Sequence, residues 1–334
     1  MMLPSTGNRG NSNISILMQD IGDWWTLFIL VLLVIIFSVT SPGFFSTQNF
    51  VSTTVSASNT IILAVAETFV IITGGIDLSV GAILGLSGMV GADVMQSLMG
   101  HGDMVALWSG LLAGLLTGVV FGAINGLVVT VLEVTPFIAT LGMLGIATGL
   151  TFLITNGTDI VNLPVELSTV GDSVLFNFLG VPVLITIIVM IIAWYYLRKT
   201  RFGKYTYAIG SNAEGTRRSG VNVKYHLFKI YTLSGLLSGL AGMIVVARIA
   251  TGSPLEGTND ELNAIAAVVI GGASLFGGRG TIFGSTVGAL IISVLVSGLV
   301  IMGVQPYWQT VTIGIIIILA VYIDQRRYRH RVLK

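Results

Sequence analysis

The sequence contains no cysteine and few charged residues. The absence of cysteine among its 334 residues excludes disulfides, thiolate metal sites and cysteine nucleophiles. Charged residues make up 9% of the chain, whereas a soluble domain carries about 25%. So few charges cannot cover a water-facing surface, and 54% of the residues are hydrophobic. The composition therefore predicts a protein that lies in a lipid bilayer.

Several chemical motifs are also missing. The three histidines, His101, His226 and His330, lie far apart and lack the spacing of a zinc site. The phosphate-binding pattern G-x-x-x-x-G-K-[ST] is absent, because Gly203-Lys204 has no glycine five residues earlier. The formal net charge of +1 offers no electrostatic basis for binding nucleic acid. We therefore expect no metal site, no ATPase activity from this chain itself and no nucleic-acid partner.

What the chain has instead is a series of apolar stretches. A spanning helix needs about 20 apolar residues, and ten stretches are bounded by glycine, proline, asparagine or a charge. The predicted spans are 24–39, 51–73, 78–99, 105–131, 136–155, 181–197, 226–250, 262–276, 282–303 and 308–323. We therefore predict an all-α polytopic membrane protein of about ten transmembrane helices. The 262–276 run is short, and the glycine pairs Gly74-Gly75 and Gly271-Gly272 interrupt neighbouring segments, so we expect discontinuous or re-entrant helices there.

The basic residues predict the orientation of these spans. Of the 16 lysines and arginines, eight fall within 198–229 and five within the tail. Basic loops stay in the cytoplasm, and even numbers of predicted spans precede and separate the two clusters, so both termini are expected in the cytoplasm. The acidic loops 156–180 and 251–261 are then expected outside. The predicted organisation is a cytoplasmic segment at 1–23, a single transmembrane domain at 24–325 and a basic cytoplasmic tail at 326–334.

The largest predicted cytoplasmic connection, 198–225, contains a short helix signal. Asn212 can cap a helix that Gly220 ends, and Glu214 and Arg218 stand at the spacing of a supporting ion pair. A short polar helix between spans suits the docking of a partner protein. A solvated loop that holds the topology by its positive charge is the alternative. The residues assigned to docking are Asn212, Glu214, Arg217, Arg218 and Gly220.

Three sequence blocks carry a family resemblance. They are TGGIDLSVG at 73–81, the pattern RFG…AIGSN…GV within 201–221, and ELNAIAAVVIGGASLFGG at 261–278. In this order and spacing they resemble the permease subunit of bacterial ABC sugar importers of the ribose, xylose, arabinose and galactose class. The resemblance runs from about residue 27 to residue 325, and it is greatest to the ribose permeases.

The resemblance implies a transport machine of several subunits in the bacterial inner membrane. Two copies of this permease, or one copy with a paralogue, would span the lipid and work by alternating access. Cytoplasmic ABC ATPase subunits would bind ATP and Mg²⁺ and drive transport, and an extracytoplasmic sugar-binding protein would deliver the ligand. The segment 212–220 would be the coupling helix that docks on the ATPase. The permease itself would bind no cofactor and catalyse no covalent reaction.

Four polar side chains in apolar surroundings are candidates for the translocation path, since buried polar groups in membranes are costly and often functional. Glu67 stands where the resembled family usually has an uncharged residue, often methionine, so it could alter substrate passage, pair with another polar group or lie near the interface. Asp77 could cap a helix or line the path, and Asn125 could bind a sugar hydroxyl or join two helices. The candidates are Glu67, Asp77, Ser79 and Asn125.

The glycine pairs are predicted to bend the chain or to allow a close approach of two backbones. The segments 70–78 and 267–275 are similar and hint at an internal repeat. The residues assigned to hinges or close packing are Gly74, Gly75, Gly271 and Gly272.

Two other classes of function compete with an ATP-driven importer. An ion-coupled secondary transporter of a small polar solute could use Glu67 or Asp77, but it has no need of a docking helix at 212–220. A membrane-embedded enzyme would need a paired nucleophile and base or metal-ligand spacing, which the sequence lacks. Ribose is the first expectation for the substrate, with xylose, galactose, another monosaccharide or a ribose-like signalling molecule as alternatives.

Overall fold

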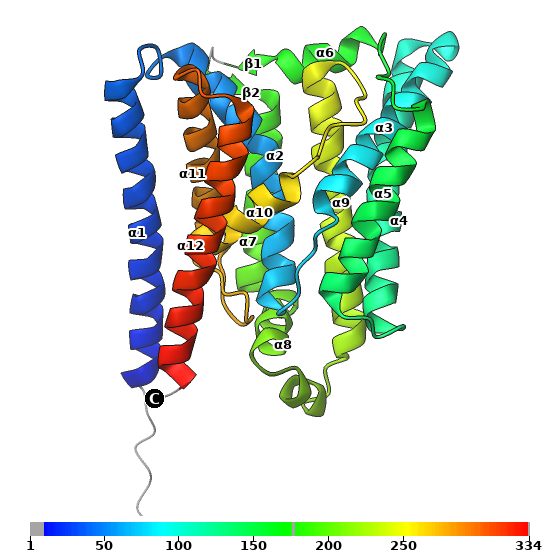
Figure 1. Cartoon of the computed structure of the whole chain (residues 1–334). Helices are drawn as coiled ribbons and strands as arrows, with labels where there is room; N and C mark the ends of the chain where they lie inside the picture. The colour runs from blue at the N-terminus through cyan, green and yellow to red at the C-terminus, as the bar shows by residue number, and fades with distance from the viewer. Residues whose placement is uncertain (1–9, 176–177, 333–334) are drawn as a thin grey trace, which may run out of the picture.

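The protein is a bundle of helices that run roughly side by side (Figure 1). The computed structural model describes residues 10–175 and 178–332. Its elements are α1 (Gly10–Thr40), α2 (Thr47–Ile72), α3 (Val80–Leu98), the 3₁₀ helix η1 (Met99–His101), α4 (Asp103–Thr130), α5 (Pro136–Thr155), α6 (Val165–Asp172), β1 (Val174–Leu175), β2 (Leu179–Gly180), α7 (Val181–Lys199), α8 (Arg201–Arg218), α9 (Val223–Ile249), α10 (Asp260–Ile270), α11 (Ile282–Ile301) and α12 (Pro306–Val332). The two short strands pair antiparallel.

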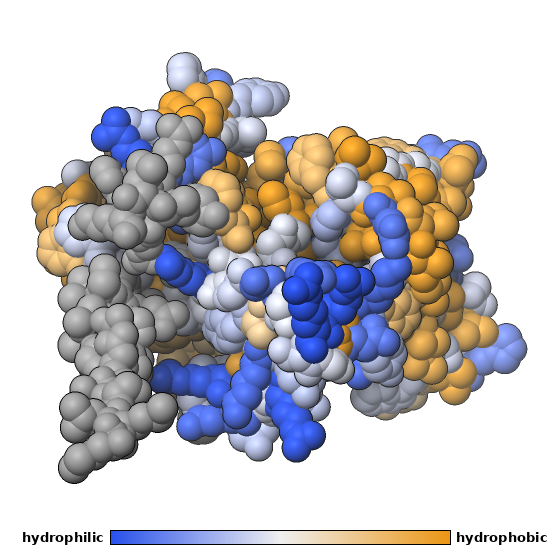
Figure 2. All heavy atoms as spheres, turned by 90° about the horizontal axis from the view of Figure 1, so that it is seen from below, coloured by the Kyte–Doolittle hydropathy of each residue, from blue (hydrophilic) through white to orange (hydrophobic). Residues whose placement is uncertain are grey.

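The all-α membrane architecture predicted from composition is confirmed. In the described ranges, eight helices are long and apolar enough to cross a bilayer, namely α2, α3 with η1, α4, α5, α7, α9, α11 and α12. The apolar part of α1, Trp25–Thr40, is shorter. Many large apolar side chains on α1, α4, α5 and α12 are exposed, and a membrane protein presents such side chains to lipid. Figure 2 shows hydrophobic residues along the outer edge of the molecule, seen from below.

The predicted span at 262–276 is discontinuous, as its short length and the glycine pair Gly271-Gly272 predict, and it is not one complete helix. The helix there, α10, has 11 residues, which extend about 16 Å at 1.5 Å per residue and cannot cross about 30 Å of hydrocarbon. The segment 251–259 descends to α10 from the end of α9 in a non-helical conformation (Figure 1). Gly257 in this segment contacts the backbone of Gly81 at the start of α3. The predicted outer loop 251–261 therefore lies partly inside the bundle.

The broken passage still takes the chain from one end of the bundle to the other. Figure 1 places the 212–220 segment, the start of α1 and the end of α12 at the same end of the bundle, and α6 at the opposite end. The basic tail is mostly helical, because α12 continues to Val332. Of the predicted terminal segments, residues 1–9 and 333–334 lie outside the described part of the chain.

Glycines bring α4 and α9 into backbone contact. Gly114, Gly118 and Gly122 recur every four residues on α4, opposite Gly235 and Gly239 of α9. A Cβ added to Gly118 would lie 2.3 Å from the carbonyl oxygen of Gly235, so no larger residue fits without moving a backbone. Helices in lipid associate through such stripes of small residues, since the hydrophobic effect does not drive them together.

Both predicted interruptions are helix ends of the same type. After α2, the amide of Gly75 donates to the carbonyl of Val70 (3.2 Å), and after α10 the amide of Ala273 donates to that of Val268 (3.1 Å). This bond is the signature of a Schellman motif, which needs a left-handed residue. Gly74 (φ +85°) and Gly272 (φ +90°) supply it. In the structure, Gly74 therefore corresponds to Gly272. The sequence similarity between 70–78 and 267–275 pairs Gly74 with Gly271, one residue earlier.

The loop between α10 and α11 contacts the end of α2. The amide of Gly278 donates to the carbonyl of Ile72 at 2.8 Å. A Cβ at Gly75 would lie 2.6 Å from Tyr231 Oη, and one at Gly271 would lie 2.3 Å from the carbonyl oxygen of Gly284. The predicted close packing is therefore present at Gly75 and Gly271, and the chain reversals are at Gly74 and Gly272.

Candidate functional site

The four predicted path residues meet in one place. Glu67 comes from α2, Asp77 and Ser79 from the turn before α3, and Asn125 from α4. Each of the four is 0% exposed, and Ser234 of α9, which joins them, is 1% exposed. We call these five residues the buried polar cluster. Their separation along the chain shows that the packing of α2, α3, α4 and α9 creates the cluster.

Asp77 is the centre of this cluster. Its Oδ1 accepts hydrogen bonds from the backbone amide of Ser79 (3.0 Å) and from Ser79 Oγ (2.6 Å), and its Oδ2 accepts one from Ser234 Oγ (2.9 Å). Ser79 Oγ in turn accepts a hydrogen bond from Asn125 Nδ2 (2.8 Å). A carboxylate that satisfies a nearby backbone amide stabilises the turn leading into a helix. Asp77 thus ties the start of α3 to α4 and α9.

Glu67 holds the same turn from the other side. Its Oε1 accepts a hydrogen bond from the backbone amide of Asp77 at 3.1 Å. Its Oε2 and the Oδ1 of Asn125 are buried and have no hydrogen-bond partner within the described residues. Of the three predictions made for Glu67, the structure shows the pairing with another polar group.

The geometry favours a structural function for the cluster. All its members are enclosed, and each bond described joins two elements of the same chain or stabilises a turn. The path-lining function of Glu67, Asp77, Ser79 and Asn125 stays a prediction. Sequence reasoning missed Ser234 and the neighbouring Tyr231, whose hydroxyl is also buried without a partner in the described chain. The available signal was polar side chains in the apolar run of α9.

We expect Glu67→Met to destabilise the folded protein more than Glu67→Gln. Methionine leaves the Asp77 amide without an acceptor in a dry site, which costs about 1–3 kcal/mol, whereas glutamine keeps one acceptor oxygen. Thermal unfolding of the detergent-solubilised protein measures the difference. If Glu67 instead contacts the substrate, both variants will change the KM of uptake and leave the unfolding midpoint unchanged.

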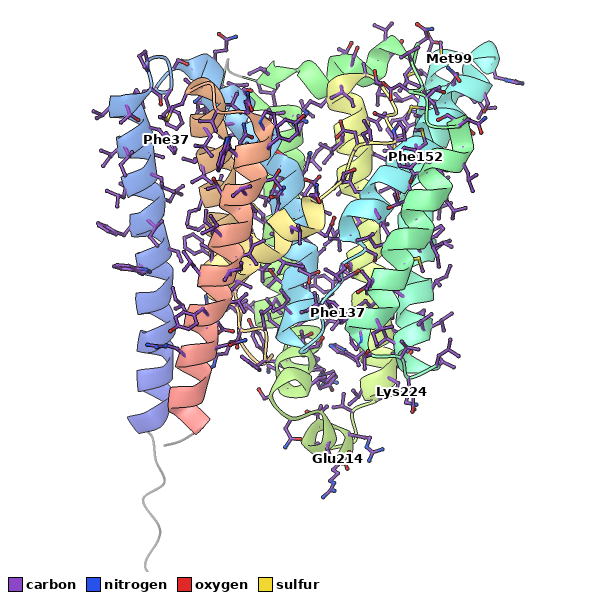
Figure 3. The ribbon with its side chains drawn as sticks, in the orientation of Figure 1. Phe37, Met99, Phe137, Phe152, Glu214 and Lys224 are labelled. Carbon is purple, nitrogen blue, oxygen red and sulfur yellow. The ribbon has the colours of Figure 1, made fainter. Side chains whose placement is uncertain are left out.

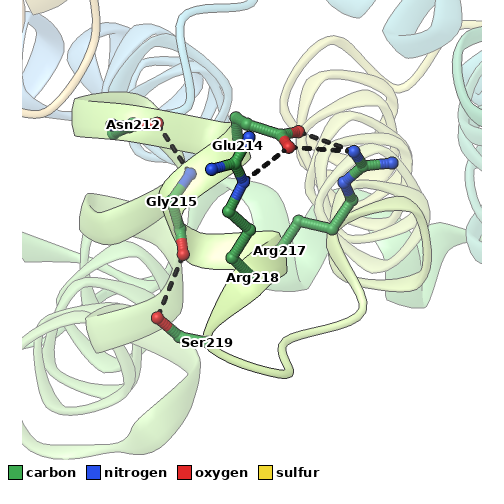
Figure 4. A network of polar contacts seen from close by, with 6 residues as sticks. All are labelled: Asn212, Glu214, Gly215, Arg217, Arg218 and Ser219. Atoms are coloured by element: carbon green, nitrogen blue, oxygen red, sulfur yellow. Dashed lines mark hydrogen bonds and ion pairs between the residues drawn. The ribbon is translucent and has the colours of Figure 1, made fainter.

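The second site is the helix at 212–220, at one end of the bundle. Asn212 leaves the helical conformation (φ −163°, ψ 94°), which kinks α8, and its Oδ1 accepts a hydrogen bond from the amide of Gly215 at 2.8 Å (Figure 4). Gly220 (φ +87°) ends the turn in the left-handed conformation. The cap and the stop predicted from the sequence are therefore both present.

The charges of this helix face outward. Glu214 pairs with Arg217 at 2.8 Å and with Arg218 at 3.0 Å, and the two arginine side chains are 70% and 78% exposed. The Arg217 guanidinium, with that of Arg218, holds the pKa of Glu214 below its usual range. The ion pairs therefore persist at neutral pH and are lost as the pH falls below that lowered pKa. Figure 3 places Glu214 and Lys224 at this end of the bundle, and Figure 2 shows hydrophilic residues gathered there.

A helix that sequence reasoning missed connects this segment to the core. Residues 201–211 form the first part of α8, where the sequence suggested a loop. Its buried residues Gly203, Thr206 and Ile209 recur every three residues, which was the available signal. Tyr207 Oη donates a hydrogen bond to the carbonyl of Gly280 at 2.6 Å. A Cβ added to Gly210 would lie 1.7 Å from the carbonyl oxygen of Ile72. The 212–220 helix is thus linked, through the first part of α8, to the end of α2 and to the loop between α10 and α11.

Comparison with known proteins identifies the family. The model of the family described as "Branched-chain amino acid transport system / permease component" matches residues 49–321. The chain belongs to this family. The ribose import permease of Escherichia coli (strain K12) is 41% identical over 314 residues, covering 90% of this chain and 93% of the relative. That of Bacillus subtilis (strain 168) is 42% identical over 315 residues, covering 93% and 94%.

Other similar permeases are named for different sugars. The D-allose transport system permease of Escherichia coli (strain K12) is 39% identical over 301 residues, which cover 90% of both chains. The fructose import permease of Rhizobium meliloti is 40% identical over 311 residues, covering 90% of this chain and 84% of the relative. No solved structure matches the chain.

Proposed function

We propose that this permease is the membrane-spanning subunit of an ATP-driven importer that moves ribose or a related monosaccharide into the cytoplasm. The observation that carries the proposal is the 41–42% identity, over at least 90% of the chain, to permeases named for ribose import. Relatives at 39–40% identity are named for allose and fructose. Ribose is therefore the first substrate to test, and the other two sugars follow.

The exposed 212–220 helix supports coupling to a separate ATPase subunit in the cytoplasm, which would bind ATP and Mg²⁺. Because α8 contacts Ile72 at the end of α2 and Gly280 in the loop between α10 and α11, movement of a docked ATPase would reach both interrupted segments. A sugar-binding protein would dock at the opposite end, and a second copy or a paralogue would complete the path. An ion-coupled carrier would expose Glu67 or Asp77 to the solute, whereas both are enclosed.

The test of this function is uptake in the native cell with the gene deleted and restored. We expect the deletion to abolish gene-dependent uptake of radiolabelled D-ribose, D-allose or D-fructose, and the restored gene to recover it. Uptake should persist when ionophores collapse the ion gradients at constant ATP, and should stop when ATP is depleted. Loss of uptake with the ionophore alone would establish an ion-coupled carrier instead.

The proposed orientation places both ends of the chain and the 212–220 helix in the cytoplasm. Because the chain has no cysteine, single cysteines report the topology directly. Thr169 in α6 and Ala213 beside the Asn212 cap are both exposed, at opposite ends of the bundle. We expect an impermeant thiol reagent to label Thr169→Cys, but not Ala213→Cys, in intact cells. Labelling of Ala213→Cys from outside would invert the proposed orientation.

A further inference from the structure

A groove with polar walls lies between α2 and α11, away from the buried polar cluster. It encloses a volume of about 290 Å³, close to the lower end of the range for small-molecule sites, about 300–1,000 Å³. Its polar lining includes Ser52, Ser56 and Thr60 of α2, Asn263 of α10, and Ser293 and Ser297 of α11. We call it the α2–α11 groove.

The lining consists of hydroxyl, amide and aliphatic side chains. Serine and threonine hydroxyls and asparagine amides can both donate and accept hydrogen bonds, as the hydroxyls of a sugar do. Val296 and Val300 add an apolar surface on the α11 side, which suits the C–H groups of a sugar ring. No ionised side chain belongs to the lining. This chemistry fits a neutral polyhydroxyl solute and not a charged one.

Some of the groove's polar groups are free to bind a ligand. Within the described residues, Ser52 Oγ and Thr60 Oγ1 make no hydrogen bond. Ser56 Oγ accepts a hydrogen bond from Arg248 Nη1 at 3.2 Å, which leaves its own hydrogen available to donate. Polar side chains at membrane depth are costly unless they face water, a ligand or each other. The polar side chains at 52, 56 and 60 recur every four residues and so form one face of α2, and that face lines the groove.

The groove occupies the half of the bundle that is remote from the 212–220 helix. Its α2 residues belong to the first half of that helix and its α11 residues to the second half, and both halves lie at the α6 end in Figure 1. Beyond Thr60, residues 61–72 of α2 are all buried, so the groove ends there. A solute that entered from the α6 end would stop at Thr60 and Asn263.

We propose that the α2–α11 groove is the outward half of the sugar path and binds a monosaccharide through Ser52, Ser56, Thr60 and Asn263. This inference rests on the proposed function and adds to it the residues that contact the substrate. The hydroxyls of Ser52 and Thr60 bind the sugar directly. The buried part of α2 below Thr60 closes the path toward the cytoplasm in this conformation.

The test compares matched substitutions on two faces of α2. Thr60→Val removes a groove hydroxyl and preserves shape, and Ser56→Phe fills the groove. Thr54→Val and Thr54→Phe are the controls, because Thr54 lies outside the groove and bonds the carbonyl of Phe50. Each variant restores the deleted gene in the native cell. Uptake of radiolabelled D-ribose, D-allose and D-fructose is measured together with the amount of permease in the membrane.

We expect Thr60→Val to raise the KM for uptake about three- to tenfold, the effect of one lost hydrogen bond, with little change in maximal rate. Ser56→Phe should lower uptake at least about tenfold at normal membrane abundance, and both Thr54 variants should transport like the wild type. Wild-type kinetics in both Thr60→Val and Ser56→Phe would overturn the groove proposal and leave the proposed function intact. Failure of the wild-type gene to restore uptake of any of the three sugars would overturn the proposed function as well.

Discussion

Arg218→Glu is expected to abolish sugar uptake and to leave the permease inserted in the membrane. Arg218 is exposed and offers a planar fork of donors next to Glu214, which suits an acidic groove on an ATPase. Charge reversal would place two carboxylates in the same contact, so we expect uptake to fall by at least about tenfold. Uptake, and co-purification of the ATPase with the permease, measure the effect.

Matched variants separate docking from a general effect of charge. Lys204→Glu makes the same reversal on the first part of α8, before the kink, and we expect it to retain more activity. Gly220→Val should fail like Arg218→Glu, because φ at Gly220 is +87° and no β-branched residue adopts it without strain. Gly220→Asn should transport, since asparagine tolerates that conformation. Normal uptake in both Arg218→Glu and Gly220→Val would reduce the segment to a topological anchor.

Asp77→Ala is expected to destabilise the permease more than any other single change in the buried polar cluster. The substitution removes the acceptor of three hydrogen bonds, two from Ser79 and one from Ser234. Leaving these donors buried and unpaired costs on the order of 3 kcal/mol or more, a large part of a total stability of about 5–15 kcal/mol. Thermal unfolding in detergent and the amount of folded protein in the membrane measure the loss.

Two milder variants complete this series. Ser234→Ala removes one hydrogen bond and should lower the stability by about 1 kcal/mol. Asp77→Asn keeps one acceptor oxygen, so its loss of stability should lie between those of Ser234→Ala and Asp77→Ala. This order follows from the number of donors left without a partner. If Asp77 instead lines the path, Asp77→Asn will lower uptake without changing the unfolding midpoint.

Local signals explain why the 212–220 helix could be predicted in detail. The cap at Asn212, the pair of Glu214 with Arg218 and the stop at Gly220 each involve residues at most four apart. The preceding part of α8 has a weak signal because its buried face, at Gly203, Thr206 and Ile209, carries only one strongly apolar side chain and lies among basic residues.

Hydropathy alone could not distinguish α10 from a spanning helix. The stretch 262–276 is apolar enough for a span, yet the helix there ends at Ile270 and begins at Asp260. Its length depends on the segment 251–259, which enters the bundle because Gly257 and Gly81 allow two backbones to touch. That contact joins residues far apart in the chain, so no local pattern reports it.

The sequence by itself determined the membrane architecture, the main helices, the two glycine interruptions and the capped helix, because each depends on composition or on neighbours within one or two turns. It also selected Glu67, Asp77, Ser79 and Asn125 as unusual polar groups in apolar surroundings. Only the tertiary structure decided that these four meet Ser234 in one enclosed cluster. It also decided that Thr60 and Asn263 line a separate groove. Both outcomes depend on which helix faces pack together, and that packing is set by contacts between separate helices, such as the bond of Ser79 to Asn125 and that of Asp77 to Ser234.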